Sequence, residues 1–63
     1  MKGLIEVTAT KGGKTITEDV YGDLADKAGL FARLMNRHKV LRSQRILWKL
    51  TNVKLLKEIK CQI

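Results

Sequence analysis

The chain has 63 residues, with 13 lysines and arginines against six acids and a formal net charge of +7. This length fits a single domain spanning residues 1–63, and a domain this short buries only about 60% of the surface that its unfolded chain exposes. The single cysteine excludes a disulfide within the chain, and one cysteine with one histidine falls short of a closed structural zinc site. Association with a second copy is another common way to stabilise so small a core, so a homodimer is one expectation.

The charge is distributed unevenly along the chain. Residues 1–32 carry a net charge of −1, whereas residues 33–63 carry +8. Such asymmetry favours a polyanionic partner, usually nucleic acid. Glu6 interrupts the first apolar residues and no run of about 18 apolar residues occurs, so we expect neither a secretory signal nor a membrane partner. With the lone cysteine, this predicts a cytoplasmic protein.

The first third of the chain predicts a β-hairpin. Apolar Ile5, Val7 and Ala9 alternate with polar residues, as in a half-buried strand. Gly12-Gly13 supply the positive φ angles of a two-residue turn. This turn fixes the register, with the opposing pairs Leu4–Tyr21, Ile5–Val20, Glu6–Asp19, Val7–Glu18, Thr8–Thr17 and Ala9–Ile16. Glu18 is then the polar misfit on an otherwise apolar face.

An amphipathic helix of about four turns is predicted to follow Gly22. Asp23 is the expected N-cap, because its carboxylate can accept a hydrogen bond from a free backbone N–H. Asp26 adds negative charge near the positive end of the helix dipole. Apolar residues then recur at helical spacing: Leu24, Ala28, Phe31, Met35 and His38.

The last third of the chain allows two interpretations. As a second hairpin, a turn at Thr51-Asn52 opposes Leu50 to Val53 and Trp48 to Leu55 on one face. As a helix, apolar residues also space acceptably: Ile46, Leu50, Val53, Leu56 and Ile59. The consistent register favours the hairpin.

The predicted fold is therefore α+β, ββαββ, with one amphipathic helix packed on a small antiparallel sheet. The alternative is ββα followed by a C-terminal helix. The expected core comprises Ile5, Val7, Ile16, Val20, Leu24, Ala28, Phe31, Met35, Trp48 and Leu50.

The main candidate binding site is a run of basic residues between positions 33 and 49, which contains no acid. Lysine and arginine on one surface neutralise phosphates and release counterions, and arginine can also form paired hydrogen bonds with guanine. The predicted contacts are Arg33, Arg37, Lys39, Arg42, Arg45 and Lys49, with Lys11 and Lys14 at the hairpin tip as secondary contacts. A solvated face that keeps the protein soluble explains the same residues without a ligand.

Other residues that could carry chemistry favour structural roles. Trp48 could stack on a base, but its place between Ile46 and Leu50 favours the core. His38 lacks a partner for acid–base catalysis at a readable spacing, and Cys61 alternates with apolar residues. The acidic residues do not have the spacing of a cation-binding loop, and Lys11-Gly12-Gly13-Lys14 lacks that of a Walker motif. We therefore expect no enzyme, no metal site and no cofactor.

Three segments carry a resemblance to a known group: Ile5 to Thr10, Gly12-Gly13, and Val53 to Cys61. Their layout resembles the small orphan proteins of lambda-like phages and prophages, which run from such a strand through glycines and one helix to a basic strand with a late cysteine. The segments cover less than half of the chain. The resemblance implies a phage accessory protein acting on host or phage macromolecules, and it carries over no functional residue.

The expected function is that of a non-enzymatic accessory protein that binds DNA or RNA. The alternative is a protein-interaction module that inhibits or modulates a host protein, or that forms a homodimer. An exposed sheet edge, which can add a strand from a partner, is the basis for this alternative.

Overall fold

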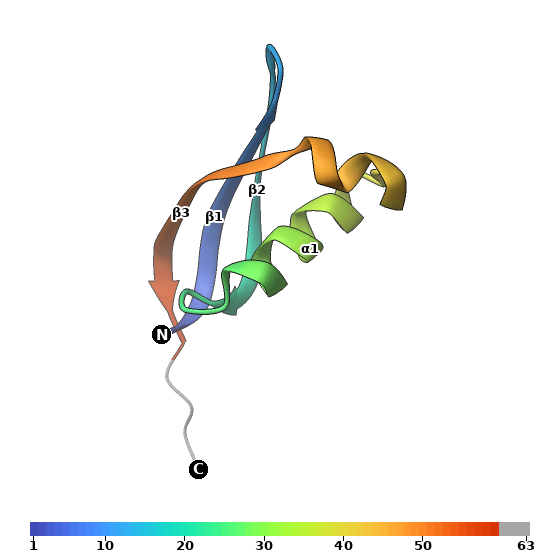
Figure 1. The fold of residues 1–63 in the computed structure, drawn as a ribbon. Coiled ribbons are helices and arrows are strands. Elements are labelled where there is room, and N and C mark those ends of the chain that lie inside the picture. The colour runs from blue at the N-terminus through green and yellow to red at the C-terminus, as the bar shows by residue number, and fades with distance from the viewer. Residues whose placement is uncertain (60–63) are drawn as a thin grey trace.

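The computed structural model describes residues 1–59, which form a three-stranded antiparallel sheet with a helix across one face (Figure 1). The elements in chain order are β1 (Lys2–Lys11), β2 (Lys14–Asp23), α1 (Lys27–Arg37), the 3-10 helix η1 (Arg42–Leu47) and β3 (Lys49–Glu58). The strand order is β2-β1-β3, so the last strand returns to pair with the first. The α+β class is as predicted.

The first hairpin has the predicted register. Ala9 faces Ile16, Val7 faces Glu18, and the pairing continues to Lys2 and Asp23. On the sheet face away from α1, the hydroxyl oxygens of Thr8 and Thr17 are 3.0 Å apart and share a hydrogen bond. Of the two turn glycines, Gly12 has a positive φ, 58°. The predicted positive φ is therefore needed at one of the two positions.

β3 differs from the prediction for the same residues. The predicted turn at Thr51-Asn52 is wrong, as is the alternative C-terminal helix, because residues 49–58 form one strand. Within residues 1–59 the sheet therefore has three strands. β3 pairs with β1, so that Leu50 faces Ala9 and Val53 faces Val7.

A shift of register explains why the hairpin prediction failed. The pairing of β1 with β3 shifts between Thr8 and Ala9, where Asn52 and Leu50 are the successive partners in β3. The residue left over, Thr51, forms a β-bulge, which changes the side-chain parity within one strand. A two-residue turn would produce the same change of parity between Leu50 and Val53. The apolar pattern alone therefore could not distinguish a bulge from a turn.

The helix begins later than predicted. Asp26, not Asp23, is the N-cap, and its Oδ1 accepts a hydrogen bond from the Gly29 N–H at 3.0 Å. Asp23 Oδ1 instead accepts from the Ala25 N–H at 3.0 Å and from the N-terminal ammonium at 3.1 Å. These two hydrogen bonds hold the pKa of the Asp23 carboxyl below its usual value, and the bond from the Ala25 N–H has the larger effect. Asp23 thus ties the β2–α1 connection to the start of the chain.

The buried core lies between α1 and the inner face of β1 and β2. Its members among the described residues are Ile5, Val7, Ala9, Val20, Leu30, Leu34 and Met35. Several predicted core residues are instead partly buried around it: Ile16, Leu24, Phe31, Trp48 and Leu50. Ala28 is exposed, and the predicted stripe missed Leu30 and Leu34, because α1 is rotated toward those two leucines.

α1 packs mainly on β2 and β1, so the inner face of β3 is less completely covered. Leu50, Val53 and Leu55 on β3 are consequently half-buried. In the described part of the chain, no helix is long and apolar enough to cross a membrane.

Candidate nucleic-acid interface

The C-terminal end of α1 is closed by two backbone hydrogen bonds. The Lys39 N–H donates to the Asn36 carbonyl at 3.1 Å, and the Val40 N–H donates to the Met35 carbonyl at 3.0 Å. This pairing is a Schellman motif, whose turning residue usually is glycine. Here Lys39 takes the left-handed conformation, with φ of 52°. Val40 then packs against the core and fixes the start of the segment that follows.

That segment, residues 41–47, is held by its own hydrogen bonds. The Gln44 N–H donates to the Leu41 carbonyl at 2.8 Å, and the Trp48 N–H donates to the Arg45 carbonyl at 3.1 Å. The Arg45 guanidinium also donates to the Asn36 side-chain oxygen on α1. Arg45 is therefore partly buried and anchors η1, whereas Arg42 is exposed.

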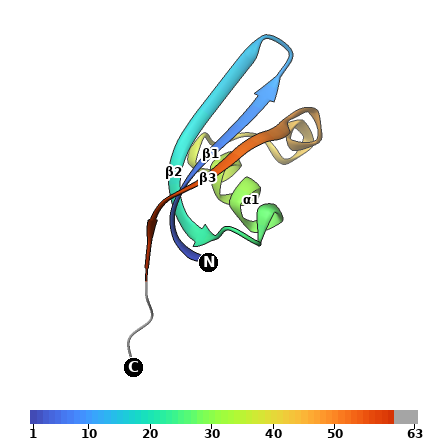
Figure 2. The ribbon, with the colours of Figure 1, turned by 90° about the vertical axis from the view of Figure 1, so that its left-hand side faces the viewer.

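The hairpin tip, the C-terminal end of α1 and η1 lie toward the same end of the molecule, away from the N-terminus (Figures 1 and 2). Lys49 faces Thr10 on β1, and Lys11 faces Lys14 in the next pair toward the tip. Basic residues that are far apart in sequence are thereby brought to one end. We call this surface the basic end, and it comprises Lys11, Lys14, Lys39, Arg42 and Lys49.

Acidic residues are absent from the segments that form this end. The sequence contains no acid between residues 27 and 57. Asp23 ends β2, Asp26 precedes α1 and Glu58 ends β3, all toward the opposite end (Figure 1). Lys2, Lys27 and Lys57 balance these three acids there, so the excess of positive charge lies toward the basic end, where Glu18 beside His38 is the nearest acid.

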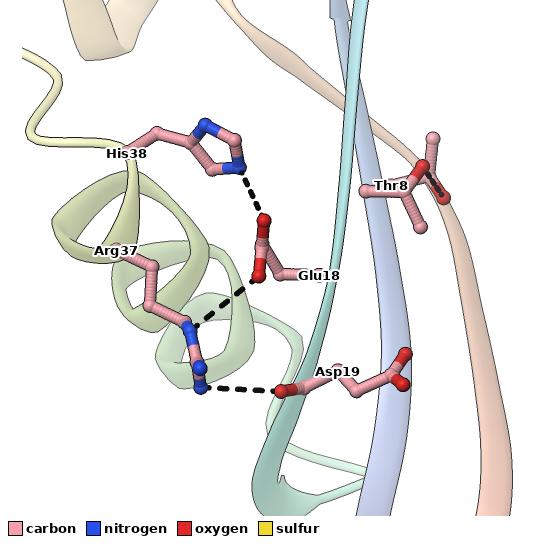
Figure 3. A network of polar contacts seen from close by, with 6 residues as sticks. Thr8, Glu18, Asp19, Arg37 and His38 are labelled. Atoms are coloured by element: carbon pink, nitrogen blue, oxygen red, sulfur yellow. Dashed lines mark hydrogen bonds and ion pairs between the residues drawn. The ribbon is translucent and has the colours of Figure 1, made fainter.

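Glu18, the polar misfit of the predicted hairpin face, is accounted for by a network on α1 (Figure 3). Glu18 Oε2 lies 3.0 Å from His38 Nε2, and Glu18 Oε1 lies 3.6 Å from Arg37 Nε. Arg37 Nη1 also donates to the Asp19 carbonyl at 3.2 Å. His38 is thus a partner of Glu18 and is not part of an apolar stripe.

The eight predicted contact residues occupy different surroundings. Five lie at the basic end and Arg45 supports it from within. Arg37 is held against β2 by Glu18 and Asp19, and Arg33 lies on the same flank of α1. There Arg33 helps to line a pocket of about 460 Å³ together with Tyr21 and Gly22. Arg37, the last residue of α1, is thus engaged by β2, whereas the residues of the basic end have no such contact among the described residues.

Sequence reasoning missed a group of exposed aliphatic side chains on the 41–47 segment. Leu41 is 65% exposed, Ile46 86% and Leu47 55%. The prediction placed Ile46 on a strand face with Trp48, where alternation would have buried it. One signal in the sequence could have found this group. Ile46 and Leu47 are adjacent apolar residues, so they do not fit the alternation of apolar and polar residues expected of a strand.

The chemistry that this surface offers is binding. It presents ammonium and guanidinium groups, which pair with phosphates or carboxylates, beside apolar side chains. Among residues 1–59, no group of three histidine, cysteine or acidic side chains could hold a metal ion. Comparison of the chain with protein-family models, curated proteins and solved structures finds no match.

Proposed function

We propose that this protein is a nucleic-acid-binding accessory protein of the phage type, which contacts phosphates through its basic end. The observation that carries the proposal is the convergence of the hairpin lysines with the basic residues that follow α1. The pairing of β1 with β3 brings these two segments together, and neither supplies an acid that would cancel the charge.

The cations of the basic end remain available to a ligand. Lys39, Arg42 and Lys49 are exposed, and the ion pairs of the described residues involve the N-terminus, Arg37 and His38 instead. Each phosphate that such a cation neutralises releases counterions from the nucleic acid, so affinity falls as salt rises. The number of these cations that contact phosphates therefore sets how steeply affinity falls with salt concentration.

The first prediction concerns the triple substitution Lys39→Gln, Arg42→Gln and Lys49→Gln. If each cation neutralises one phosphate, the slope of log affinity against log salt becomes shallower by about 2.7 on double-stranded DNA. Fluorescence anisotropy of a labelled duplex across a salt series, repeated with single-stranded DNA and RNA, measures this slope and identifies the preferred polymer.

A charge-matched control is provided by Lys2, Lys27 and Lys57, which are exposed and lie toward the opposite end. Changing all three to glutamine produces the same net charge and should leave the salt slope close to that of the wild type. Equal slopes for the two triple variants would mean that only net charge matters, and the assignment to the basic end would fail.

A second candidate function, a protein-interaction module, is favoured by a shallow, open groove between α1 and the start of β3. It has a volume of about 280 Å³ and is lined by Lys27, Ala28, Phe31, Trp48 and Leu50. We propose a second copy of this chain as its occupant. Only one lining residue is charged, so two copies can approach here, whereas contact through the basic ends would oppose like charges. A core of seven side chains among the described residues also gains from a partner.

The second prediction uses Ala28, which lines this groove and is exposed on the first turn of α1. Ala28→Arg should convert a dimer to a monomer in sedimentation equilibrium without changing the circular dichroism spectrum, because no buried side chain is altered. Ala25→Arg, at an exposed position before the helix, is the control that should remain dimeric. A wild-type protein that is monomeric at high concentration would overturn this candidate.

A further inference from the structure

Three aliphatic side chains that the sheet and helix do not cover protrude beside the cations of the basic end. Leu41, Ile46 and Leu47 are each more than half exposed, in a molecule whose described core has only seven buried side chains. Water contact at such residues is unfavourable by about 25 cal/mol for each Å² of apolar surface, so a group of them marks a binding surface. We call these three residues the aliphatic knob.

The surroundings of the aliphatic knob restrict what can bind to it. Arg42 lies within the same segment, and Lys39 and Lys49 flank it. A second copy of the chain would oppose these cations to one another. The complementary ligand has apolar material framed by negative charge, and stacked base pairs bordered by phosphates have this arrangement.

The shape of the aliphatic knob favours insertion. Ile46 is 86% exposed, so it projects from the surface. Its segment is fixed by the backbone hydrogen bonds at Leu41 and Arg45 and by the Arg45–Asn36 contact. A side chain held on a rigid turn loses little conformational freedom when it binds. Proteins that kink duplex DNA insert such aliphatic side chains between neighbouring base pairs.

We propose, on the basis of the nucleic-acid function inferred above, that the ligand is duplex DNA and that Ile46 is inserted between two base pairs from the minor groove. Leu47 covers the opened base step beside it. Arg42 and Lys49 contact the phosphates on either side and Lys11 and Lys14 reach further along the backbone. Insertion separates the base pairs on one side, so the duplex bends away from the protein.

The experiment measures bending and affinity together. A duplex of 20 base pairs with a donor and an acceptor dye at its ends reports the bend by energy transfer, and anisotropy reports the affinity. The wild type should bend the duplex, within the range of about 20–90° known for inserted side chains. Ile46→Ala should abolish the bend and lower duplex affinity about tenfold. Its affinity for single-stranded DNA should be unchanged, because a single strand has no paired step to open.

Leu56→Ala is the matched control, because Leu56 is an exposed aliphatic residue on β3, 43% exposed, outside the aliphatic knob. It should bend and bind as the wild type does. Duplex binding without bending, with Ile46→Ala equal to the wild type, would overturn the insertion while leaving the proposed function intact. Absence of any binding to nucleic acid would overturn both. Vesicles of equal phosphatidylserine and phosphatidylcholine test a lipid ligand. If Ile46→Ala lost binding to these vesicles but still bent the duplex, Ile46 would contact lipid and the insertion would be overturned.

Discussion

Replacing Leu34 with alanine is expected to lower the free energy of unfolding by about 3 kcal/mol. Leu34 is fully buried on the face of α1 that packs against the sheet, next to Leu30 and Met35 in the core. Truncation removes its apolar contacts and leaves a cavity that a sheet with a single helix cannot readily fill. A domain of this length has a total stability of only about 3–9 kcal/mol, so this one side chain accounts for at least about a third of it. Urea denaturation followed by circular dichroism measures the change.

Leu41→Ala is the control for this prediction, because it removes the same atoms from a side chain that is 65% exposed. It should change the free energy of unfolding by less than about 0.5 kcal/mol. If the two variants lost equal stability, the core would not lie between α1 and the sheet as described.

Replacing Gly3 with alanine is expected to lower the free energy of unfolding as much as Leu34→Ala does, but for a different physical reason. Gly3 is buried on β1 and faces Glu58 at the end of β3. A β-carbon at this position would collide with the backbone carbonyl oxygen of Lys57. The obstacle is backbone, which cannot rotate away as a side chain can, so the end of β3 must separate from β1. We expect a loss of about 3 kcal/mol, in line with other cases of severe local strain.

The amide of Ile59 reports this separation directly, because it donates to the Lys2 carbonyl at 2.9 Å. Its hydrogen exchange should accelerate in Gly3→Ala more than exchange in the β1–β2 hairpin does. Gly13→Ala is the control, since nothing lies within 4 Å of a β-carbon built there. Normal protection of the Ile59 amide in Gly3→Ala would show that β3 does not approach Gly3 as closely as described.

Pairing between neighbouring strands could be predicted from the sequence, whereas pairing between distant segments could not. The β1–β2 register followed from Gly12-Gly13 and strict alternation, because a short turn leaves one alignment that keeps Ile5, Val7 and Ala9 on one face. No equivalent signal exists for β3. Its partner is β1, whose paired residues are 39 to 55 positions away in sequence, and its alternation is broken by the bulge at Thr51.

The helix start shows a second limit of sequence reasoning. Asp23 and Asp26 are both good N-cap residues, and the sequence offers no reason to prefer the second. Asp23 still pairs with Lys2 in the sheet, and its Oδ1 accepts from the Ala25 N–H and the N-terminal ammonium, so the helix begins after it. The rotation of α1 toward Leu30 and Leu34 is decided in the same way, by the two strands on which the helix packs.

The residues of the candidate site could be predicted from the sequence, but their positions relative to one another could be predicted only in part. The basic residues were evident from the sequence, but their grouping depends on contacts that no local pattern encodes. Glu18 draws Arg37 against β2, whereas the pairing of Thr10 with Lys49 places the residues after η1 on the part of β1 that leads to the hairpin tip. Exposure of Ile46 follows from η1, a short helix inserted before a strand that was expected to begin earlier.

The central position of β1 has a consequence for the order in which the molecule is assembled. Of the described elements β1 is synthesised first and β3 last, yet the two lie side by side in the sheet. Until β3 is made, β1, β2 and α1 can associate with one another. The edge of β1 that later pairs with β3 then has no partner, and the part of the inner sheet face that β3 supplies is missing. Pairing β3 with β1 joins residues 39 to 55 positions apart in sequence, which is slow compared with forming a hairpin. A nascent or truncated chain that lacks β3 therefore exposes one unpaired edge of β1, the kind of surface that associates with other chains.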